Sequence, residues 1–378
     1  MTISRFYLAI SILVGAIVGV GIFSLPYLAS QAGFFVSLFW LTLLALVSAY
    51  LHLMYGEIIL RTGQEHRFPG YVRYYLGKIW GLLSSFSTIF GLWLSQLVYI
   101  IVGAGFLELI FKNFVKPPPG FWAFSLFILG AFFIYLDITR LAKGELFFNF
   151  FLILIFFLIF LASWSLIRFE NFYGFSRQNF FLPYGATLFT LTGLMSIAEV
   201  KEVLAPDFSL FKKAIKAGIF ISALISLIFL ITVLGVSGNL TSENSIAGLE
   251  KFLPRSIIAL LSGFGFLAVF TSFLTTGFSL KKVFWYDWAV PKNLSFFFAV
   301  LPPIIFYFSS FKNFIEIISF SGTIFLGFDA LLLLFIYRKS KTKGDRSPEY
   351  SLRSSILPLF IGIILVLGVL AYFFKNPI

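Results

Sequence analysis

Three glycines and a proline interrupt the first long apolar stretch of the chain, in the segment VGAIVGVGIFSLPY (residues 14–27). Each interior glycine destabilises a helix by about 1 kcal/mol relative to alanine, and proline costs more. A helix that opens here exposes backbone N–H groups, which can hold a carboxylate, and carbonyl oxygens, which can hold a cation. The segment therefore predicts an unwound helix that binds a small charged ligand through its backbone.

A second apolar stretch, YGATLFTLTGLMSIAEV (residues 184–200), carries a similar interruption. Its polar and flexible residues are Thr190, Thr192, Gly193, Ser196 and Glu199. Paired interruptions in corresponding spans of two inverted halves indicate the binding site of a secondary transporter. The structural alternative is close helix packing, because Gly15-x-x-x-Gly19 also matches the small-xxx-small pattern of membrane helices.

The composition is that of a polytopic membrane protein. Hydrophobic residues make up 60% of the 378 residues, charged residues only 12%, and the mean hydropathy is +0.99, which no soluble domain of this size would match. The chain has no cysteine and two histidines, which excludes disulfides and thiolate sites and argues against a His-rich metal centre. The net charge of +12 predicts no nucleic-acid partner, because the basic residues lie in short loops between apolar stretches.

About 20 apolar residues cross a bilayer as a helix, and eleven such stretches predict an all-α integral membrane protein with a single transmembrane domain over residues 1–378. They lie at residues 6–30, 34–60, 79–111, 121–137, 147–168, 184–204, 213–236, 256–284, 294–309, 315–337 and 354–374. The first is expected to be a retained span and not a signal peptide.

The basic residues predict the orientation. With the N-terminus in the cytoplasm, 20 of the 28 Lys and Arg residues fall in inside segments and eight in outside segments, which satisfies the positive-inside rule. We therefore expect a multi-pass protein of the plasma (inner) membrane with a cytoplasmic N-terminus and an external C-terminus.

The segment GAIVGVGIFSLP (15–26) resembles the first-helix signature of the amino acid–polyamine–organocation superfamily, in particular its amino acid/auxin permease and aromatic amino acid permease branches. The segment LFTLTGLMSIAEVKEVL (188–204) resembles their sixth helix, with Ala198 in place of the usual proline. The resemblance implies a LeuT-type fold of two inverted five-helix repeats and transport of an amino acid with Na⁺ or H⁺. The repeats would occupy residues of about 6–168 and 184–337, followed by an extra helix at 354–374.

The resemblance also implies a substrate site. The carboxylate would meet backbone N–H groups after the first break, those of Val20, Gly21 and Ile22. The amino group would meet oxygen atoms of the broken sixth span, around Phe189, Thr190, Thr192 and Gly193. In span three, Ser95 and Tyr99 share a helix face, and the tyrosine hydroxyl is expected to reach the carboxylate. Gln96 beside them can instead bond to a neighbouring helix.

Span eight contains AVFTSFLTT, in which Ala268, Thr271 and Ser272 share one helix face. Na⁺ prefers several oxygen ligands, and hydroxyls with freed carbonyls supply them. In sodium-coupled relatives the same spacing meets two first-helix carbonyls, which here match Gly15 and Val18. The alternative is that these hydroxyls bond back to carbonyls of their own helix.

Two departures from related sequences bear on the ion. Ile22 stands where some relatives place an asparagine for a second sodium, and span five lacks the buried lysine that replaces sodium in some proton-coupled relatives. Both favour one coupling Na⁺, with H⁺ as the alternative, and no cofactor is expected.

Charged residues within the spans form the last group. Asp329 lies roughly 12 Å deep in span ten at 1.5 Å per residue, and an intramembrane carboxylate is a functional hypothesis by default. Asp329 and Glu199 are therefore candidates for coupling or gating. Three structural interactions are also expected: Glu57 with Arg61, Glu108 with Lys112, and a hydrogen bond from His52, either at the membrane interface or to a neighbouring helix.

These features favour a transporter over other membrane proteins. An enzyme would need convergent acids, histidines or a nucleophile with its base, and a channel would need a pore loop or charged ring. A sensor or scaffold with the same fold stays open. The expected partners are the lipid bilayer and an amino acid, aromatic or otherwise neutral, with no obligatory protein partner.

Overall fold

The computed structural model describes residues 2–137, 145–309, 313–353 and 356–375, and within these ranges all regular structure is helical. The first half contains α1 (Thr2–Ile17), η1 (Val20–Ser24), α2 (Leu25–Ala32), α3 (Phe34–Arg61), α4 (Phe68–Leu76), α5 (Lys78–Phe111), α6 (Phe121–Tyr135) and α8 (Glu145–Ser163). The second half contains α9 (Leu182–Thr190), η4 (Leu194–Ser196), α10 (Ile197–Leu204), α11 (Phe211–Ser237), α12 (Arg255–Lys282), α13 (Lys292–Phe308), α14 (Phe314–Phe320), η8 (Ser321–Leu326), α15 (Gly327–Lys343) and α16 (Leu357–Lys375).

Six of these helical stretches are long and apolar enough to cross a membrane, and a seventh results when the two parts of the first span are joined across their bend of 46°. The chain is therefore a multi-pass membrane protein. The eleven apolar stretches predicted from the sequence overlap helices, apart from residues 354–355, which lie outside the described residues. However, α6, α8 and α13 contain only shorter apolar segments, and the sixth stretch is divided between the short helices α9 and α10. Both spans predicted to be interrupted are interrupted: α1 gives way to η1 and α2, and α9 to η4 and α10.

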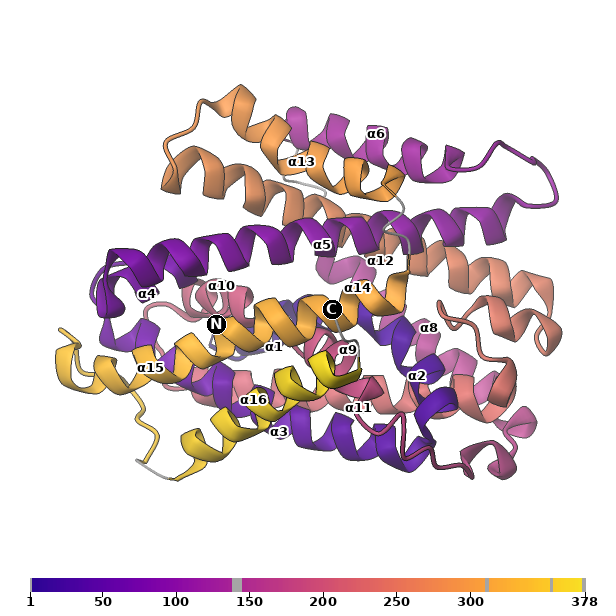
Figure 1. Ribbon diagram of the computed structural model, residues 1–378, viewed down its shortest axis with the longest axis horizontal. Coiled ribbons are helices and arrows are strands. Elements are labelled where there is room, and N and C mark those ends of the chain that lie inside the picture. Colours follow the sequence, from indigo (N-terminus) through magenta and orange to yellow (C-terminus); the bar gives the residue numbers. More distant parts are fainter. Residues whose placement is uncertain (1, 138–144, 310–312, 354–355, 376–378) are drawn as a thin grey trace.

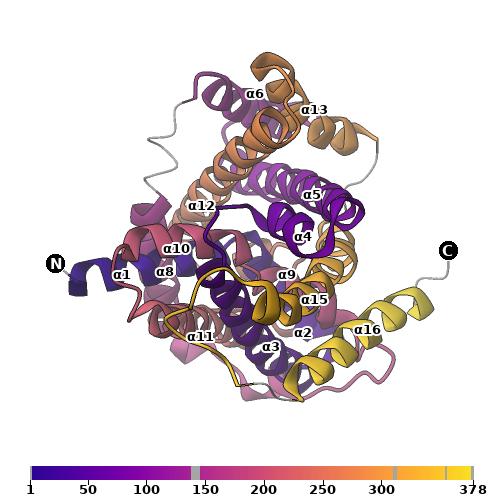
Figure 2. The same ribbon diagram turned by 90° about the vertical axis from the view of Figure 1, so that its left-hand side faces the viewer.

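The helices form two groups that face each other (Figures 1 and 2). Helices α5, α6, α12 and α13 lie together as a four-helix layer, in which α12 packs along α5. Buried side chains of this layer, including Ile134, Phe273 and Ala299, form a hydrophobic cluster separate from the main one. The other group, here called the bundle, contains the two broken spans with α3 and α11. The first break contacts this layer where η1 meets α5.

Three charged residues fix one end of the four-helix layer. Asp137 accepts hydrogen bonds from Lys281 Nζ and Lys292 Nζ, each at 2.6 Å. Lys281 is almost fully buried and also donates to the carbonyl of Ile134 at 3.1 Å. This network therefore joins the end of α6 to α12 and α13 through charge-assisted hydrogen bonds.

Glu57, at the end of α3, is fully buried and holds the segment between α15 and α16 in place. Its carboxylate accepts from Arg61 Nε at 2.9 Å, which confirms the expected pair. It also accepts from Ser351 Oγ at 2.9 Å, Leu352 N–H at 2.7 Å and Tyr337 OH at 3.2 Å. A buried carboxylate of this kind stabilises the folded protein only as long as its four hydrogen-bond donors stay in place.

We expect Glu57→Ala to destabilise the protein by about 3–5 kcal/mol, because the half-buried guanidinium of Arg61 and the buried N–H of Leu352 would lose their acceptor. The matched control is Glu65→Ala, since the Glu65 side chain is 74% exposed and lies 3.5 Å from Lys201. Its loss should cost less than about 1 kcal/mol. Unfolding in detergent, followed by tryptophan fluorescence, measures both, and equal effects would contradict the structural role of Glu57.

The pair predicted between Glu108 and Lys112 is wrong. Lys112 instead forms an ion pair with Glu250, which belongs to the segment between α11 and α12. The i, i+4 spacing made the predicted pair geometrically allowed, but exposed charged side chains pair with whichever partner the tertiary structure brings near.

Candidate functional site

Helix α1 ends because the backbone N–H group of Gly19 does not continue its hydrogen-bond pattern. The N–H of Gly19, which would continue α1 by bonding to the carbonyl of Gly15, bonds to Ile17 O at 2.9 Å. Gly19 itself is extended (φ −119°, ψ −153°), and Ile22 N–H bonds to Gly19 O at 3.3 Å. The Gly15 carbonyl thus loses its helical donor, and in the described part of the chain no backbone N–H reaches the Val18 carbonyl. Both oxygens are available to a cation.

The second break is held by α3. The N–H of Gly193 donates to Nε2 of His52 at 3.0 Å, and Ser48 Oγ donates to the carbonyl of Leu191 at 2.7 Å. The other ring nitrogen of His52, Nδ1, lies 2.7 Å from the Ser48 carbonyl. These partners assign a neutral ring with its proton on Nδ1. His52 is 1% exposed, and its expected role as an interhelical hydrogen-bonder is confirmed.

The two breaks touch each other. A Cβ atom added to Gly21 would lie 2.5 Å from Thr190 Oγ1 and 2.9 Å from Thr190 Cα. One added to Gly193 would lie 2.7 Å from Cγ1 of Ile17, at the end of α1. Both glycines are therefore required by close approach of one broken span to the other.

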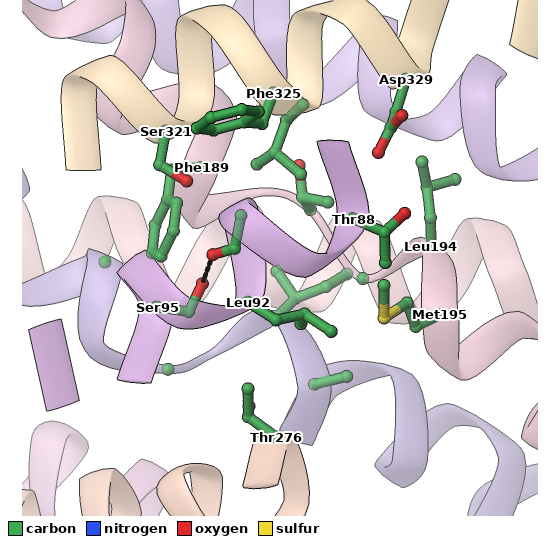
Figure 3. Close-up of a pocket in the computed structure, with 18 of the residues that line it drawn as sticks. Thr88, Leu92, Ser95, Phe189, Leu194, Met195, Thr276, Ser321, Phe325 and Asp329 are labelled. Atoms are coloured by element: carbon green, nitrogen blue, oxygen red, sulfur yellow. Dashed lines mark hydrogen bonds between the residues drawn. The ribbon is translucent and has the colours of Figure 1, made fainter. Parts of the chain in front are cut away.

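A cavity of about 200 Å³ lies where the breaks meet the four-helix layer and α15 (Figure 3). Eight of the nine residues predicted to bind substrate line it: Val20, Gly21, Ser95, Tyr99, Phe189, Thr190, Thr192 and Gly193. The exception is Ile22, whose side chain is fully buried outside the cavity lining. Of the two coupling candidates, Asp329 lines the cavity, whereas Glu199 is exposed on α10 and does not.

Three of the hydroxyl groups that line the cavity already donate their protons to nearby backbone carbonyls. Ser95 Oγ donates to Gly91 O at 2.9 Å, and the Thr190 and Thr192 hydroxyls donate to carbonyls one turn earlier at 2.7 Å. A hydroxyl that donates once can still accept hydrogen bonds. These groups are therefore suited to receive N–H donors from a ligand, such as an ammonium group.

Several cavity residues were not found from the sequence. Thr88 and Leu92 lie on α5, and with Ser95 and Tyr99 they follow helical spacing along one face. Extending that face by two turns would have identified them. Met195, Thr276 and Phe325 also line the cavity and are labelled in Figure 3. Gln96 faces away: with its amide suitably oriented, it bonds to Ala299 O and Gly277 N–H, both at 3.0 Å.

The residues predicted to hold Na⁺ lie outside this cavity lining. Ala268 and Thr271 are buried, at 4% and 3% exposure, and Thr271 Oγ1 donates to the carbonyl of Ala268 at 2.9 Å. Ser272 is half-buried. Back-bonding of Thr271 matches the alternative raised by the sequence, but it leaves the lone pairs of its hydroxyl available.

We expect His52→Ala to disorder the second break, because it leaves the buried N–H of Gly193 without an acceptor at a cost of about 1–3 kcal/mol. Substrate binding should weaken together with the melting temperature. His52→Gln is the control, since its amide oxygen can accept the same hydrogen bond and should preserve most of the binding. Equal binding by the alanine variant and the native protein would show that His52 does not position the break.

Comparisons with known proteins agree with this architecture. The crystal structure of MhsT in complex with L-phenylalanine superposes with a TM-score of 0.65 at 12% sequence identity, covering 98% of this chain and 97% of that chain. The protein therefore has the LeuT fold expected from the sequence. No curated protein matches the chain. The model of the tryptophan/tyrosine permease family matches residues 2–375, which confirms the expected superfamily and a transporter rather than an enzyme. The chain belongs to the tryptophan/tyrosine permease family.

Proposed function

We propose that the protein is a secondary active transporter that imports an aromatic amino acid by alternating access, coupled to Na⁺. The observation that carries the proposal is the contact between two helix breaks, at Gly21 and Thr190, beside an internal cavity. Opposed breaks of this kind present backbone groups to a substrate near the middle of a membrane.

The family description and the L-phenylalanine in the MhsT complex support an aromatic substrate. The cavity itself supports the same class, because Leu92, Phe189, Met195 and Phe325 supply large apolar surfaces around few polar groups. Such a lining suits a ring, with hydrogen-bonding groups placed to orient it.

We assign the substrate carboxylate to the N–H groups of Val20 and Gly21. Ile22 was proposed with them, but its N–H already bonds to Gly19 O, so its role is to shape the turn. The substrate amino group is assigned to oxygens near Phe189, Thr190 and Thr192, with Ser95 and Tyr99 on the opposite wall.

For the coupling ion, we propose one Na⁺ bound by the carbonyls of Gly15, Val18 and Ala268 and the hydroxyls of Thr271 and Ser272. The freed carbonyls of α1 support this assignment. Proton coupling is the alternative, with Asp329 ahead of Glu199 because only Asp329 lines the cavity. A non-transporting sensor with the same fold is the second alternative.

We also propose eleven membrane spans in a plasma (inner) membrane, with the N-terminus inside and the C-terminus outside. The two inverted repeats would cover about residues 6–168 and 184–337. The last span, predicted at 354–374 and formed by α16, would be an addition that packs against α15 and η8.

Ligand-induced stabilisation of the purified protein tests the substrate class. A ligand present at 100 times its Kd stabilises the folded state by about 2.7 kcal/mol. We expect tryptophan, tyrosine or phenylalanine to raise the melting temperature in NaCl, whereas lysine and glutamate should not. No response to any aromatic amino acid, in NaCl or at low pH, would contradict the proposal.

A further inference from the structure

One wall of the cavity carries a buried carboxyl group, one oxygen of which has no hydrogen-bond partner among the described residues. Asp329, in the first turn of α15, is 7% exposed, and its Oδ1 atom has no hydrogen-bond partner among the described residues. The hydroxyls of Ser84 and Ser87 on α5 lie close enough to interact with the carboxyl group, and Ser87 also donates to the carbonyl of Phe325 at 3.2 Å. A buried acid without a cation nearby is costly in a membrane interior, so a ligand is expected to complete the site.

The unpartnered groups are gathered around this acid. Ser84 and Thr88 are buried, and their hydroxyl oxygens also lack partners in the described structure. Figure 3 shows the Asp329 carboxyl group directed into the cavity on the side of Thr88 and Leu194. Ser95 and Phe189 lie on the other side of the cavity in the same view. The acid is therefore separated from the region assigned above to the substrate's carboxylate and amino groups.

We infer that Asp329 is a specificity-determining residue that accepts a hydrogen bond from the substrate side chain, the phenol O–H of tyrosine or the indole N–H of tryptophan. This inference rests on the proposed function, and it identifies the residue that recognises the substrate side chain in the same site. Phenylalanine has no such donor and would leave the buried acid unsatisfied. A site that hydrogen-bonds a substrate hydroxyl strongly rejects an analogue that lacks the hydroxyl. This discrimination is much larger than that of an apolar pocket between two substrates that differ by one methylene group.

Binding of tyrosine and phenylalanine to the purified native protein and to three variants tests the inference. The native protein should bind tyrosine about 10- to 100-fold more tightly than phenylalanine, which corresponds to one hydrogen bond to an acid. Asp329→Leu, of similar size without an acceptor, should bind both amino acids equally, because phenylalanine then no longer leaves a buried acid unsatisfied. Asp329→Asn retains an acceptor and should keep part of the preference. Asp207→Asn, a change at a fully exposed carboxylate in the loop after α10, should behave as the native protein.

The outcomes separate this inference from the proposed function. Failure of the native protein to bind any aromatic amino acid overturns both. Binding without a preference for tyrosine, or a preference that survives in Asp329→Leu, overturns only the role of Asp329. A third outcome is that Asp329→Leu and Asp329→Asn weaken the binding of both amino acids equally and remove the pH dependence of binding. Asp329 would then carry a coupling proton, and the inference would be overturned.

Discussion

Replacing Gly21 with leucine is expected to abolish amino acid binding while the protein still inserts into the membrane. A side chain at this position meets the backbone and hydroxyl of Thr190 within 2.9 Å, and overpacking of this kind costs about 1–3 kcal/mol even after relaxation. Leucine would also cover the N–H groups assigned to the substrate carboxylate. We expect affinity to fall by about 100-fold or more, since the loss of charge-assisted hydrogen bonds adds to the steric cost.

Gly19→Ala is the matched control for this change. It lies two residues earlier in the same break, yet a Cβ atom there meets no other atom within 4 Å. The backbone of Gly19 is extended, which alanine also adopts. Gly19→Ala should therefore bind substrate much more tightly than Gly21→Leu, and native affinity in Gly21→Leu would place the substrate elsewhere.

Removing two of the five proposed sodium ligands is expected to eliminate the effect of Na⁺ on substrate affinity. If Na⁺ ties α12 to the freed carbonyls of α1, its binding and substrate binding strengthen each other equally, by a factor of about 5–150. In Thr271→Ala/Ser272→Ala this mutual effect should disappear, while affinity measured without Na⁺ stays near the native value. Titration of substrate in NaCl and in choline chloride measures both quantities.

Ser262→Ala is the control for the double variant, because Ser262 is a fully buried hydroxyl on the same helix but outside the proposed site. It should retain the native response to Na⁺. If the substrate affinity of the native protein changes only with pH, or if that of the double variant still changes with Na⁺, this cation site is rejected and proton coupling is favoured.

The sequence predicted features that depend on one helix at a time. The breaks near Gly19 and Gly193 and the shared face of Ser95 and Tyr99 follow from local propensity and the 3.6-residue period. These features fix where a helix opens and which side chains share a face. They do not fix how the helix is rotated against its neighbours.

The partners in most contacts between distant segments were not predicted. The bond from Gly193 to His52 joins residues 141 positions apart, and Glu57 meets Leu352 across 295 positions. Such partners depend on how whole helices pack, which periodicity within one helix does not specify. For the same reason Glu199 lies exposed on α10, although it belongs to an apolar run in the sequence.

Uptake of radiolabelled tyrosine by proteoliposomes tests the central claim most directly. The purified protein would be reconstituted, and uptake compared under an inward Na⁺ gradient, an inward proton gradient and no gradient. The proposal predicts accumulation of tyrosine above its external concentration under the Na⁺ gradient, and none with Gly21→Leu. Accumulation driven only by the proton gradient would contradict the sodium assignment, and absence of accumulation under every gradient would contradict secondary active transport.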